Sequence, residues 1–323
     1  MSIGSNIKKR RYELRMSQQD LAAVLGYKSR STIAKIESGE NDISQKKLQK
    51  FAEALDTTVE SLINGTSVKS LYSSFDASPN ADDYNPVPSG SSNRIRTVAV
   101  ILAGGKSSRN HLNIPNQFIN IHGKPVIIYS MEAYQAHPAI DDLYIVCLKG
   151  WEQITLAYAE QYHITKLRGL IPAASSGILS VQNGLEYIKK QYDDDDIIIF
   201  QESTRPMISV DMISKLLQAC YENRSANICR SMKDYVQFTY ADQKARYVDR
   251  NTIVDLQSPE AYTFRIIKDV FARAKKTQHP LTESCCAMLM YNLGYDINFI
   301  EGSVNNIKII RQEDIPIIEA LLK

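Results

Sequence analysis

The stretch VAVILAGGKSSRNHLNIPNQF, residues 98–118, decides the fold of the larger part of the chain. Residues 97–102 are a β-branched, apolar run, which is typical of a strand buried on both faces of a parallel sheet. Three small residues and then two cations follow it: Ala103, Gly104, Gly105, Lys106 and Arg109. Backbone N–H groups without bulky side chains can wrap ligand oxygens, so the stretch predicts a phosphate-binding loop. The alternative is an ordinary strand-to-helix turn with two solvated cations.

The longer string separates these alternatives. LAGGKSSR is followed by Pro115, Gln117 and Phe118, and then by GKP at 123–125. This string resembles the nucleotidyltransferases that activate sugar and polyol phosphates, above all the cytidylyltransferases acting on methylerythritol phosphate and on ribitol phosphate. The resemblance implies a nucleotide-diphospho-sugar transferase fold, which is Rossmann-like. It also implies that CTP and Mg²⁺ sit over the loop while a sugar or polyol phosphate attacks the α-phosphorus and releases pyrophosphate.

Composition excludes several classes of protein. A chain of 323 residues allows two domains, and a net charge of +2 excludes a globally basic nucleic-acid binder. No apolar run approaches the length of a membrane span, and the start lacks an apolar signal region, so we expect a cytoplasmic protein without membrane contact. Five cysteines without metal-ligand spacing predict reduced, buried thiols.

Residues 1–66 predict an all-α bundle of about five short helices with a helix-turn-helix. Ser17 is expected to cap one helix, and Gly26 to turn the chain toward the next. The segment SQQDLAAVLGYKSRSTIAKIESGE, residues 17–40, resembles the phage-repressor (XRE) class. That resemblance implies double-stranded operator DNA as partner and contacts from Gln18, Arg30, Ser31 and Lys35, with Arg30 reading guanine. The alternative is a solvated helix face without a DNA role.

Residues 67–94 are rich in Ser, Asn, Asp and Pro and predict a flexible linker, and residues 95–323 predict the second domain. In that domain, further strands are expected at 143–148, 197–200, 226–230 and 307–310, with helices at 126–136, 177–190 and 210–220 between them. This alternation predicts a doubly wound, mostly parallel α/β sheet with ligands at the carboxyl ends of its strands. The acidic run 193–196 is interpreted as a solvated turn rather than a metal site.

The resemblance also implies roles for single residues. Arg109 matches a loop arginine that steadies the triphosphate, and Ser180 a serine near base and ribose. Arg205 and Lys308 match phosphate-binding cations, and Glu202 stands where the family has its magnesium-site aspartate. In the family that this domain resembles, catalysis is mainly positioning and stabilisation of charge on the phosphoryl oxygens.

The departures from the family pattern remove charge. Asn116 stands where the family has a catalytic lysine, residues 173–177 lack its arginine, and Asn305 replaces a second aspartate. Each lost charge in a desolvated site costs roughly two to three orders of magnitude in rate. Because the side chain of Lys106 is long and lies in the same loop, our hypothesis is that it replaces the missing lysine in part.

Three functions fit these observations. The first is a DNA-binding regulator that binds CTP or a CDP-linked sugar or polyol and has weak or no catalysis. The second is an active CTP-dependent cytidylyltransferase that carries a DNA-binding module. In the third, the C-terminal domain only dimerises. Members of both families act as dimers, so we expect a homodimer that presents two recognition helices to a two-fold operator.

Overall fold

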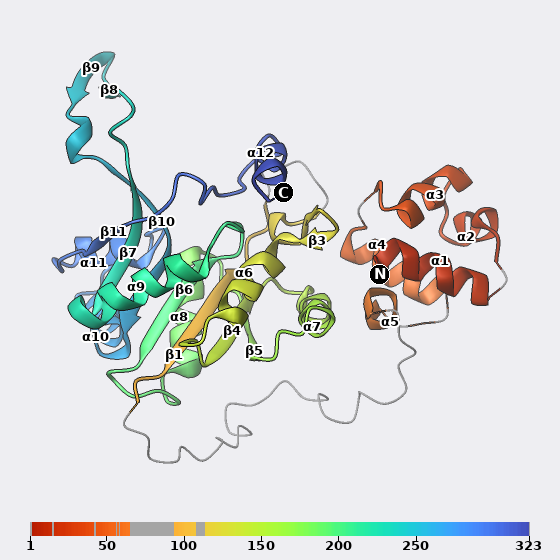
Figure 1. The fold of residues 1–323 in the computed structure, drawn as a ribbon, viewed down its shortest axis with the longest axis horizontal. Coiled ribbons are helices and arrows are strands. Elements are labelled where there is room, and N and C mark those ends of the chain that lie inside the picture. Colours follow the sequence, from red (N-terminus) through yellow and green to blue (C-terminus); the bar gives the residue numbers. More distant parts are fainter. Residues whose placement is uncertain are drawn as a thin grey trace.

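The computed structural model describes residues 2–14, 16–41, 43–55, 57, 59–64, 94–107 and 114–322. Most of the predicted linker, and Arg109, lie outside the described residues. The described elements fall into an N-terminal group of helices and a C-terminal α/β group, which lie side by side in Figure 1. The described helices are each too short or too polar to cross a lipid bilayer.

The N-terminal group is the predicted bundle. Its helices are α1 (Ile3–Glu13), α2 (Gln18–Val24), α3 (Arg30–Ser38), α4 (Gln45–Ala54) and α5 (Val59–Asn64). Ser17 and Asp20 form the expected capping box at the start of α2, since each side chain accepts from the other residue's backbone N–H. Gly26 has φ of 74°, a left-handed conformation that lets the chain turn between α2 and α3. The helices close on a core that includes Ile7, Ile33 and Phe51.

A seven-stranded sheet forms the centre of the C-terminal group, with strand order β11-β7-β10-β6-β1-β4-β5. The strands are β1 (Thr97–Ala103), β4 (Asp142–Cys147), β5 (Leu167–Pro172), β6 (Ile197–Glu202), β7 (Ser225–Ser231), β10 (Val254–Thr263) and β11 (Phe299–Glu301). Among these described strands, β10 runs antiparallel to both of its neighbours and the other pairings are parallel. The predicted α/β fold with a mostly parallel sheet is therefore confirmed.

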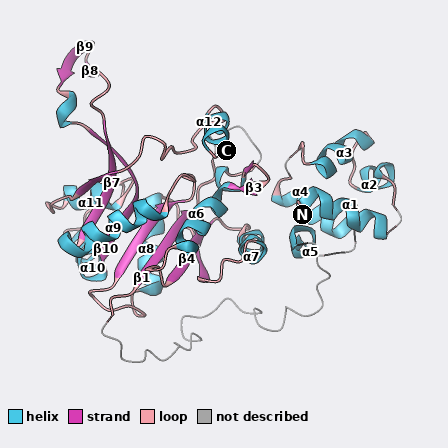
Figure 2. Ribbon diagram, in the orientation of Figure 1, coloured by secondary structure: helices cyan, strands magenta, loops and turns pink. Residues whose placement is uncertain are grey.

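Helices cover both faces of the sheet (Figure 2). One face packs against α6 (Val126–Ala136), α7 (Glu152–Gln161) and α9 (Val210–Asn223). The other packs against α8 (Gly177–Ile188), α10 (Phe264–Lys276) and α11 (Cys286–Asn292). Side chains of β1 alternate between the two cores, with Ala99 and Ile101 in one and Val98 and Val100 in the other. The predicted strand is thus buried on both faces.

Smaller elements surround the sheet. They are η1 (Asn116–Phe118), the two-stranded pair β2 (Asn120–Ile121) and β3 (Lys124–Pro125), the hairpin β8 (Gln237–Ala241) and β9 (Lys244–Val248), η2 (Arg250–Thr252) and α12 (Asp314–Leu321). The β8–β9 hairpin projects far from the body of the domain (Figure 1).

The strand predicted at 307–310 is wrong. This segment has no regular structure, and the edge of the sheet is formed by β11 instead. A backbone hydrogen bond from Ile309 N to Thr204 O (2.9 Å) fixes the segment beside the end of β6. Two predicted helices also end elsewhere: α8 stops at Ile188, and α9 continues to Asn223, where Arg224 takes a left-handed conformation (φ 64°).

Candidate nucleotide site and DNA-binding surface

The glycine loop follows β1 at the carboxyl edge of the sheet and is held in place by a buried amide. Gln117 is 1% exposed, and its Nε2 donates to Ala103 O (2.8 Å) and Gly105 O (3.0 Å). The two bonds tie the start and the middle of the loop to the turn η1, while leaving the loop N–H groups for a ligand. Gln117 belongs to the motif quoted from the sequence, but its role in holding the loop was not predicted. Its polar side chain next to a glycine loop is the feature that could have indicated this role.

Gly104 has a steric reason to be glycine. A Cβ added there would lie 2.5 Å from the Cβ of Ala173, which is far below a normal contact distance. Gly105 has open space around it, since nothing lies within 4 Å of an added Cβ. Next to Gly104, the Ser180 Oγ accepts from Ala174 N (3.0 Å). The structure therefore brings Gly104 and Ser180 together, with Ala173 next to the glycine, while their role in nucleotide binding stays a prediction.

Lys106 is exposed at the end of this loop, so its predicted part in replacing the missing lysine stays a prediction. Arg109 lies outside the described residues, so its predicted triphosphate contact stays a prediction.

Asn116 has a structural role in this chain. It is 4% exposed, and its Nδ2 donates to Ile309 O (3.0 Å) and to Ile310 O (3.5 Å). Its backbone N–H donates to Ser107 Oγ (2.8 Å) at the end of the loop. The amide thus joins the loop to the segment that carries Lys308, and it supplies no positive charge.

Three charged side chains converge at the end of β6. Glu202 forms ion pairs with Arg205, whose Nε lies 2.7 Å from Oε2, and with Lys308. Arg205 also donates through Nη1 to Asn306 O (2.6 Å). Burial alone would raise the pKa of Glu202, but the charges of Lys308 and Arg205 outweigh it, so the pKa is lowered. Both predicted phosphate cations are therefore present and already paired with one carboxylate.

The described side chains do not form a magnesium site by themselves. In the described part of the chain, no three His, Cys, Asp or Glu side chains come together as metal ligands. Glu202 is a single carboxylate with two cationic partners, and Asn305 offers no second one. Magnesium is typically held by one or two carboxylates together with substrate phosphates and water. The residues in place therefore leave most of the ligand set to a bound nucleotide.

Two other sequence expectations are met in part. Asp194 and Asp195 are exposed and pair with Arg265, while Asp194 also pairs with Lys268, as in a solvated acidic turn. Asp196 departs from this expectation, because it is buried, accepts from Arg96 N (2.7 Å) and pairs with the Arg96 guanidinium. All five cysteines are free thiols, and four of them are buried. Burial raises the pKa of Cys147 to about 11, which keeps this thiol protonated and unreactive near neutral pH.

A buried carboxyl lies on β10, the strand that pairs with β6. Glu260 on β10 is 5% exposed, and its Oε2 lies 2.7 Å from Tyr262 Oη and accepts from Ala287 N (2.9 Å). Tyr262 Oη also lies 2.8 Å from Asn227 Oδ1. Burial raises the pKa of Glu260.

The helix-turn-helix presents the predicted DNA-reading residues on its surface. Arg30, Ser31 and Lys35 are exposed on α3, with the first two at its N-terminal end. Gln18 is half-buried, and its Nε2 donates to Glu37 Oε2 (2.9 Å). A surface hollow contains the N-terminal end of α2 and is lined by Lys8, Arg11, Tyr12, Met16, Ser17, Gln18, Gln19 and Arg30. Lys8 and Arg30 are its exposed cations, and the predicted contact of Gln18 with a DNA phosphate stays a prediction.

A buried ion pair supports this surface. The Arg11 Nε lies 2.6 Å from Glu37 Oε1, and Nη2 donates to Oε2 (3.0 Å). Both side chains are at least nine-tenths buried. The pairing, first of all its hydrogen bonding, raises the pKa of Arg11. Because Glu37 also accepts from Gln18, the pair orients the N-terminal end of α2 against α3.

Comparisons with known proteins identify a family for each of the two parts of the chain. Residues 97–323 match the family described as 2-C-methyl-D-erythritol 4-phosphate cytidylyltransferase, and residues 7–62 match a helix-turn-helix family. A ribitol-5-phosphate cytidylyltransferase of Lacticaseibacillus paracasei is 28% identical over 228 residues, covering 70% of this chain and 97% of that protein. A 2-C-methyl-D-erythritol 4-phosphate cytidylyltransferase of Clostridium botulinum is 27% identical over 231 residues, covering 71% of this chain and 98% of that protein.

A solved structure shows the same fold. The 4-diphosphocytidyl-2C-methyl-D-erythritol synthase of Anaerococcus prevotii aligns with a TM-score of 0.60 at 21% identity, covering 71% of this chain and 96% of that one. The family match covers well over half of the chain. The chain therefore belongs to the 2-C-methyl-D-erythritol 4-phosphate cytidylyltransferase family and carries a helix-turn-helix DNA-binding domain at its N-terminal end.

Proposed function

We propose that the protein is a DNA-binding transcriptional regulator whose cytidylyltransferase domain binds CTP or a CDP-linked polyol and transfers the nucleotide slowly or not at all. The observation that carries this proposal is Asn116. Its buried amide occupies the position of the family's catalytic lysine and bonds two backbone carbonyls. No charge is therefore available there for the triphosphate.

The remaining charges support binding more than transfer. Lys308 and Arg205 face the end of β6 as a pair of cations suited to phosphates, but Glu202 neutralises one of the two charges. A preorganised cation contributes several kcal/mol when charge develops in a dry site, and a missing one costs a similar amount. A site with fewer cations still binds a triphosphate. Fast transfer requires more, because the site must stabilise the transition state more strongly than it binds the substrate.

The N-terminal domain supplies the DNA binding. A regulator of this kind acts in the cytoplasm, where both DNA and CTP are present. Arg30 projects toward the major groove, where it donates to guanine O6 and N7. An Arg30→Ala protein should lose about 1 to 3 kcal/mol of specific binding, or roughly ten- to hundredfold in affinity. The control is Lys50→Ala, which removes an exposed cation of α4 outside this surface. Equal losses in the two variants would refute base reading by Arg30.

The proposed homodimer is supported by the projecting β8–β9 hairpin. Its Phe238, Tyr240 and Tyr247 are 59%, 74% and 61% exposed. Aromatic side chains gathered on a protruding arm are typical of a surface that another chain covers. A two-fold dimer would place two recognition helices on one operator.

Pyrophosphate release tests the proposed loss of transfer. The assay contains the full chain, CTP, Mg²⁺ and either ribitol 5-phosphate or 2-C-methyl-D-erythritol 4-phosphate, the substrates named by the relatives. We expect slow or no release from the native sequence and faster release from Asn116→Lys. Release by the native sequence at a rate of about 1 to 1,000 per second, the usual range for enzymes, would refute this proposal.

The second candidate is an active polyol-phosphate cytidylyltransferase that carries a DNA-binding module. One observation favours it: Glu202, Arg205 and Lys308 lie together at the end of β6, although Lys308 is 106 residues from Glu202 in the chain. In this candidate, Glu202 would supply one carboxylate ligand for a Mg²⁺ ion that is otherwise held by the phosphates of CTP and by water. Fast release with either phosphate substrate is the result that would establish it.

A further inference from the structure

The two domains pack against each other. Helix α5 of the helix-turn-helix domain lies on α7 of the cytidylyltransferase domain. As a result, α7 is covered on two sides, by the sheet and by α5, and leaves only Gln153, Leu156 and Glu160 exposed. A surface helix packed on one face alone exposes a wider polar face. The sequence of α7 thus fits a helix that lies between two domains.

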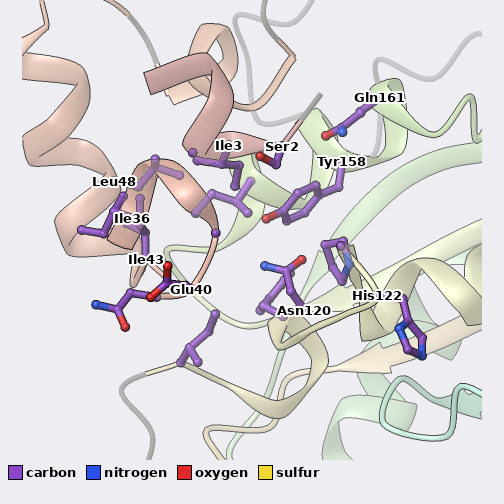
Figure 3. A pocket seen from close by; sticks show the side chains of 18 of the residues that line it. Ser2, Ile3, Ile36, Glu40, Ile43, Leu48, Asn120, His122, Tyr158 and Gln161 are labelled. Atoms are coloured by element: carbon purple, nitrogen blue, oxygen red, sulfur yellow. The ribbon is translucent and has the colours of Figure 1, made fainter. Parts of the chain in front are cut away.

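A cavity of about 390 Å³ lies beside this contact (Figure 3). Ile3, Ile36 and Ile43 line it from the helix-turn-helix domain, and Phe118, Trp151 and Tyr158 line it from the other domain. Figure 3 shows Ile3 and Tyr158 on facing sides of the cavity. The contact is therefore apolar at its centre, and it involves α1, the end of α3 and the turn that follows α3.

The turn η1 links the cavity to the nucleotide loop. Phe118 stacks on Trp151, with ring centroids 4.3 Å apart and an interplanar angle of 13°. Phe118 follows Gln117, whose amide binds the loop carbonyls of Ala103 and Gly105. The same three-residue turn η1 therefore holds the nucleotide loop on one side and lines the interdomain cavity on the other.

The contact leaves the DNA-reading end of α3 free. Arg30 and Ser31 are exposed at the start of α3 and are absent from the cavity lining, whereas Ile36 and Gly39 at its end line the cavity. Residues at the N-terminal end of a recognition helix contact base edges. Docking thus fixes the direction in which the recognition helix points without covering its reading residues.

We propose that this interdomain contact transmits nucleotide binding to DNA binding, an inference that rests on the proposed function above. A nucleotide on the loop and the docked helix-turn-helix both require η1 in one conformation, so each favours the other. Docking fixes the recognition helices of a dimer at one spacing, which raises DNA affinity by removing unproductive orientations. Coupling energies between sites in proteins usually correspond to about 5- to 150-fold in affinity, so CTP should tighten DNA binding within that range.

Trp151 makes the contact measurable. It is the only tryptophan of the chain, and it is 8% exposed beside the cavity. Two substitutions, one on each side of the contact, introduce a charge: Ile3→Glu and Tyr158→Glu. Neither residue belongs to the loop or to the DNA-reading set. Each variant should shift Trp151 emission to the red, because separation of the domains exposes the indole to water. Leu156→Glu is the matched control, since Leu156 lies on α7 but is 41% exposed.

The decisive experiment measures DNA affinity with and without CTP for the full chain and the three variants. The probe is a duplex that the full chain selects from a random-sequence library in the absence of nucleotide. CTP binding, measured by calorimetry, shows that each variant is folded around its loop. We expect CTP to tighten DNA binding about 5- to 150-fold in the native and Leu156→Glu proteins and to have no effect in the two contact variants.

The outcomes distinguish failure of the proposed function from failure of the proposed coupling between the two sites. If the native chain fails to bind CTP or DNA, the proposed function is wrong, and the inference falls with it. If the native chain binds both and CTP leaves DNA affinity unchanged, only the coupling is refuted. The same holds if both contact variants bind CTP and still respond to it. A variant that no longer binds CTP is replaced by the variant on the other side of the contact.

Discussion

Replacing Glu202 with glutamine should tighten CTP binding. The carboxylate is the shared partner of Arg205 and Lys308, the two cations that the resemblance assigns to phosphates. Glutamine keeps the length of the side chain and its ability to accept a hydrogen bond, but it removes the negative charge. Both cations are then free to pair with a triphosphate, and the repulsion between carboxylate and phosphate is lost.

The size of this effect follows from the position of Glu202. At a separation of about 5 Å, two unit charges repel by roughly 3 kcal/mol at an effective dielectric constant of about 20, and by about 1 kcal/mol at about 60. The Glu202 side chain is 31% exposed, so solvent screens it substantially and the lower figure applies. We therefore expect the Kd for CTP to fall about fivefold.

The assay is calorimetric titration of the full chain with CTP in EDTA, so that no metal contributes. Asp194→Asn is the matched control, because Asp194 also lies between two cations, Arg265 and Lys268, but precedes β6 and is at the opposite end of this strand. Its substitution should leave the Kd unchanged. An unchanged or higher Kd in Glu202→Gln would show that Glu202 does not compete with the phosphates, and it would refute the reasoning.

Three further predictions concern the supporting structure. Glu37→Gln leaves Arg11 buried without its counter-charge, so the helix-turn-helix should lose about 3 kcal/mol or more of stability in thermal unfolding, while CTP still binds. Glu260→Gln should stabilise the fold more at about pH 8 than at about pH 5, as measured by urea unfolding. Burial raises the pKa of Glu260, so the favourable protonated state is present at low pH and is lost as the pH rises through the folded pKa. Gly104→Ala should abolish CTP binding, because its Cβ would lie 2.5 Å from a neighbouring alanine Cβ, whereas Gly105→Ala, which meets nothing within 4 Å, should retain it.

Features that depend on neighbouring residues could be predicted from the sequence. The capping box at Ser17, the left-handed turn at Gly26 and the buried strand β1 each follow from a local pattern of side chains. The order of strands in the sheet does not, because it depends on crossovers that no single window contains. The resemblance of the loop motif implied the class of fold but gave no strand order.

The error at 307–310 has a physical cause. Ile307, Ile309 and Ile310 give the apolar pattern of a short strand, but the segment lies beside the end of β6, and both sides of β6 are already paired, with β10 and with β1. The segment instead makes one backbone hydrogen bond with Thr204 and accepts two from the Asn116 side chain, and both of these residues lie far away in the chain. The local sequence pattern indicates that a segment is apolar and extended. It does not indicate whether a neighbouring strand is free to pair with that segment.

The same limit applies to the candidate site. The residue types at Glu202, Arg205 and Lys308 indicated phosphate chemistry, but their mutual pairing depends on a contact between positions 106 residues apart. The role of Gln117 is closer to predictable, since it is only 14 residues from Ala103. Counting charges in the sequence therefore gives the number of cations in the site. It does not show that the Glu202 carboxylate is ion-paired with both Arg205 and Lys308.

Asn116 affects both the charge available to a triphosphate and the way in which the loop is held in place. A lysine there would bring a charge to the triphosphate, whereas the asparagine bonds the carbonyls of Ile309 and Ile310 and so joins the Lys308 segment to the turn η1. That turn also carries Phe118, which lines the contact with the helix-turn-helix domain. The substitution that removes catalytic charge thus adds a bond between nucleotide site and interdomain contact. A protein that signals through this turn benefits from a long-lived nucleotide complex, because rapid turnover would end the state that DNA binding reports.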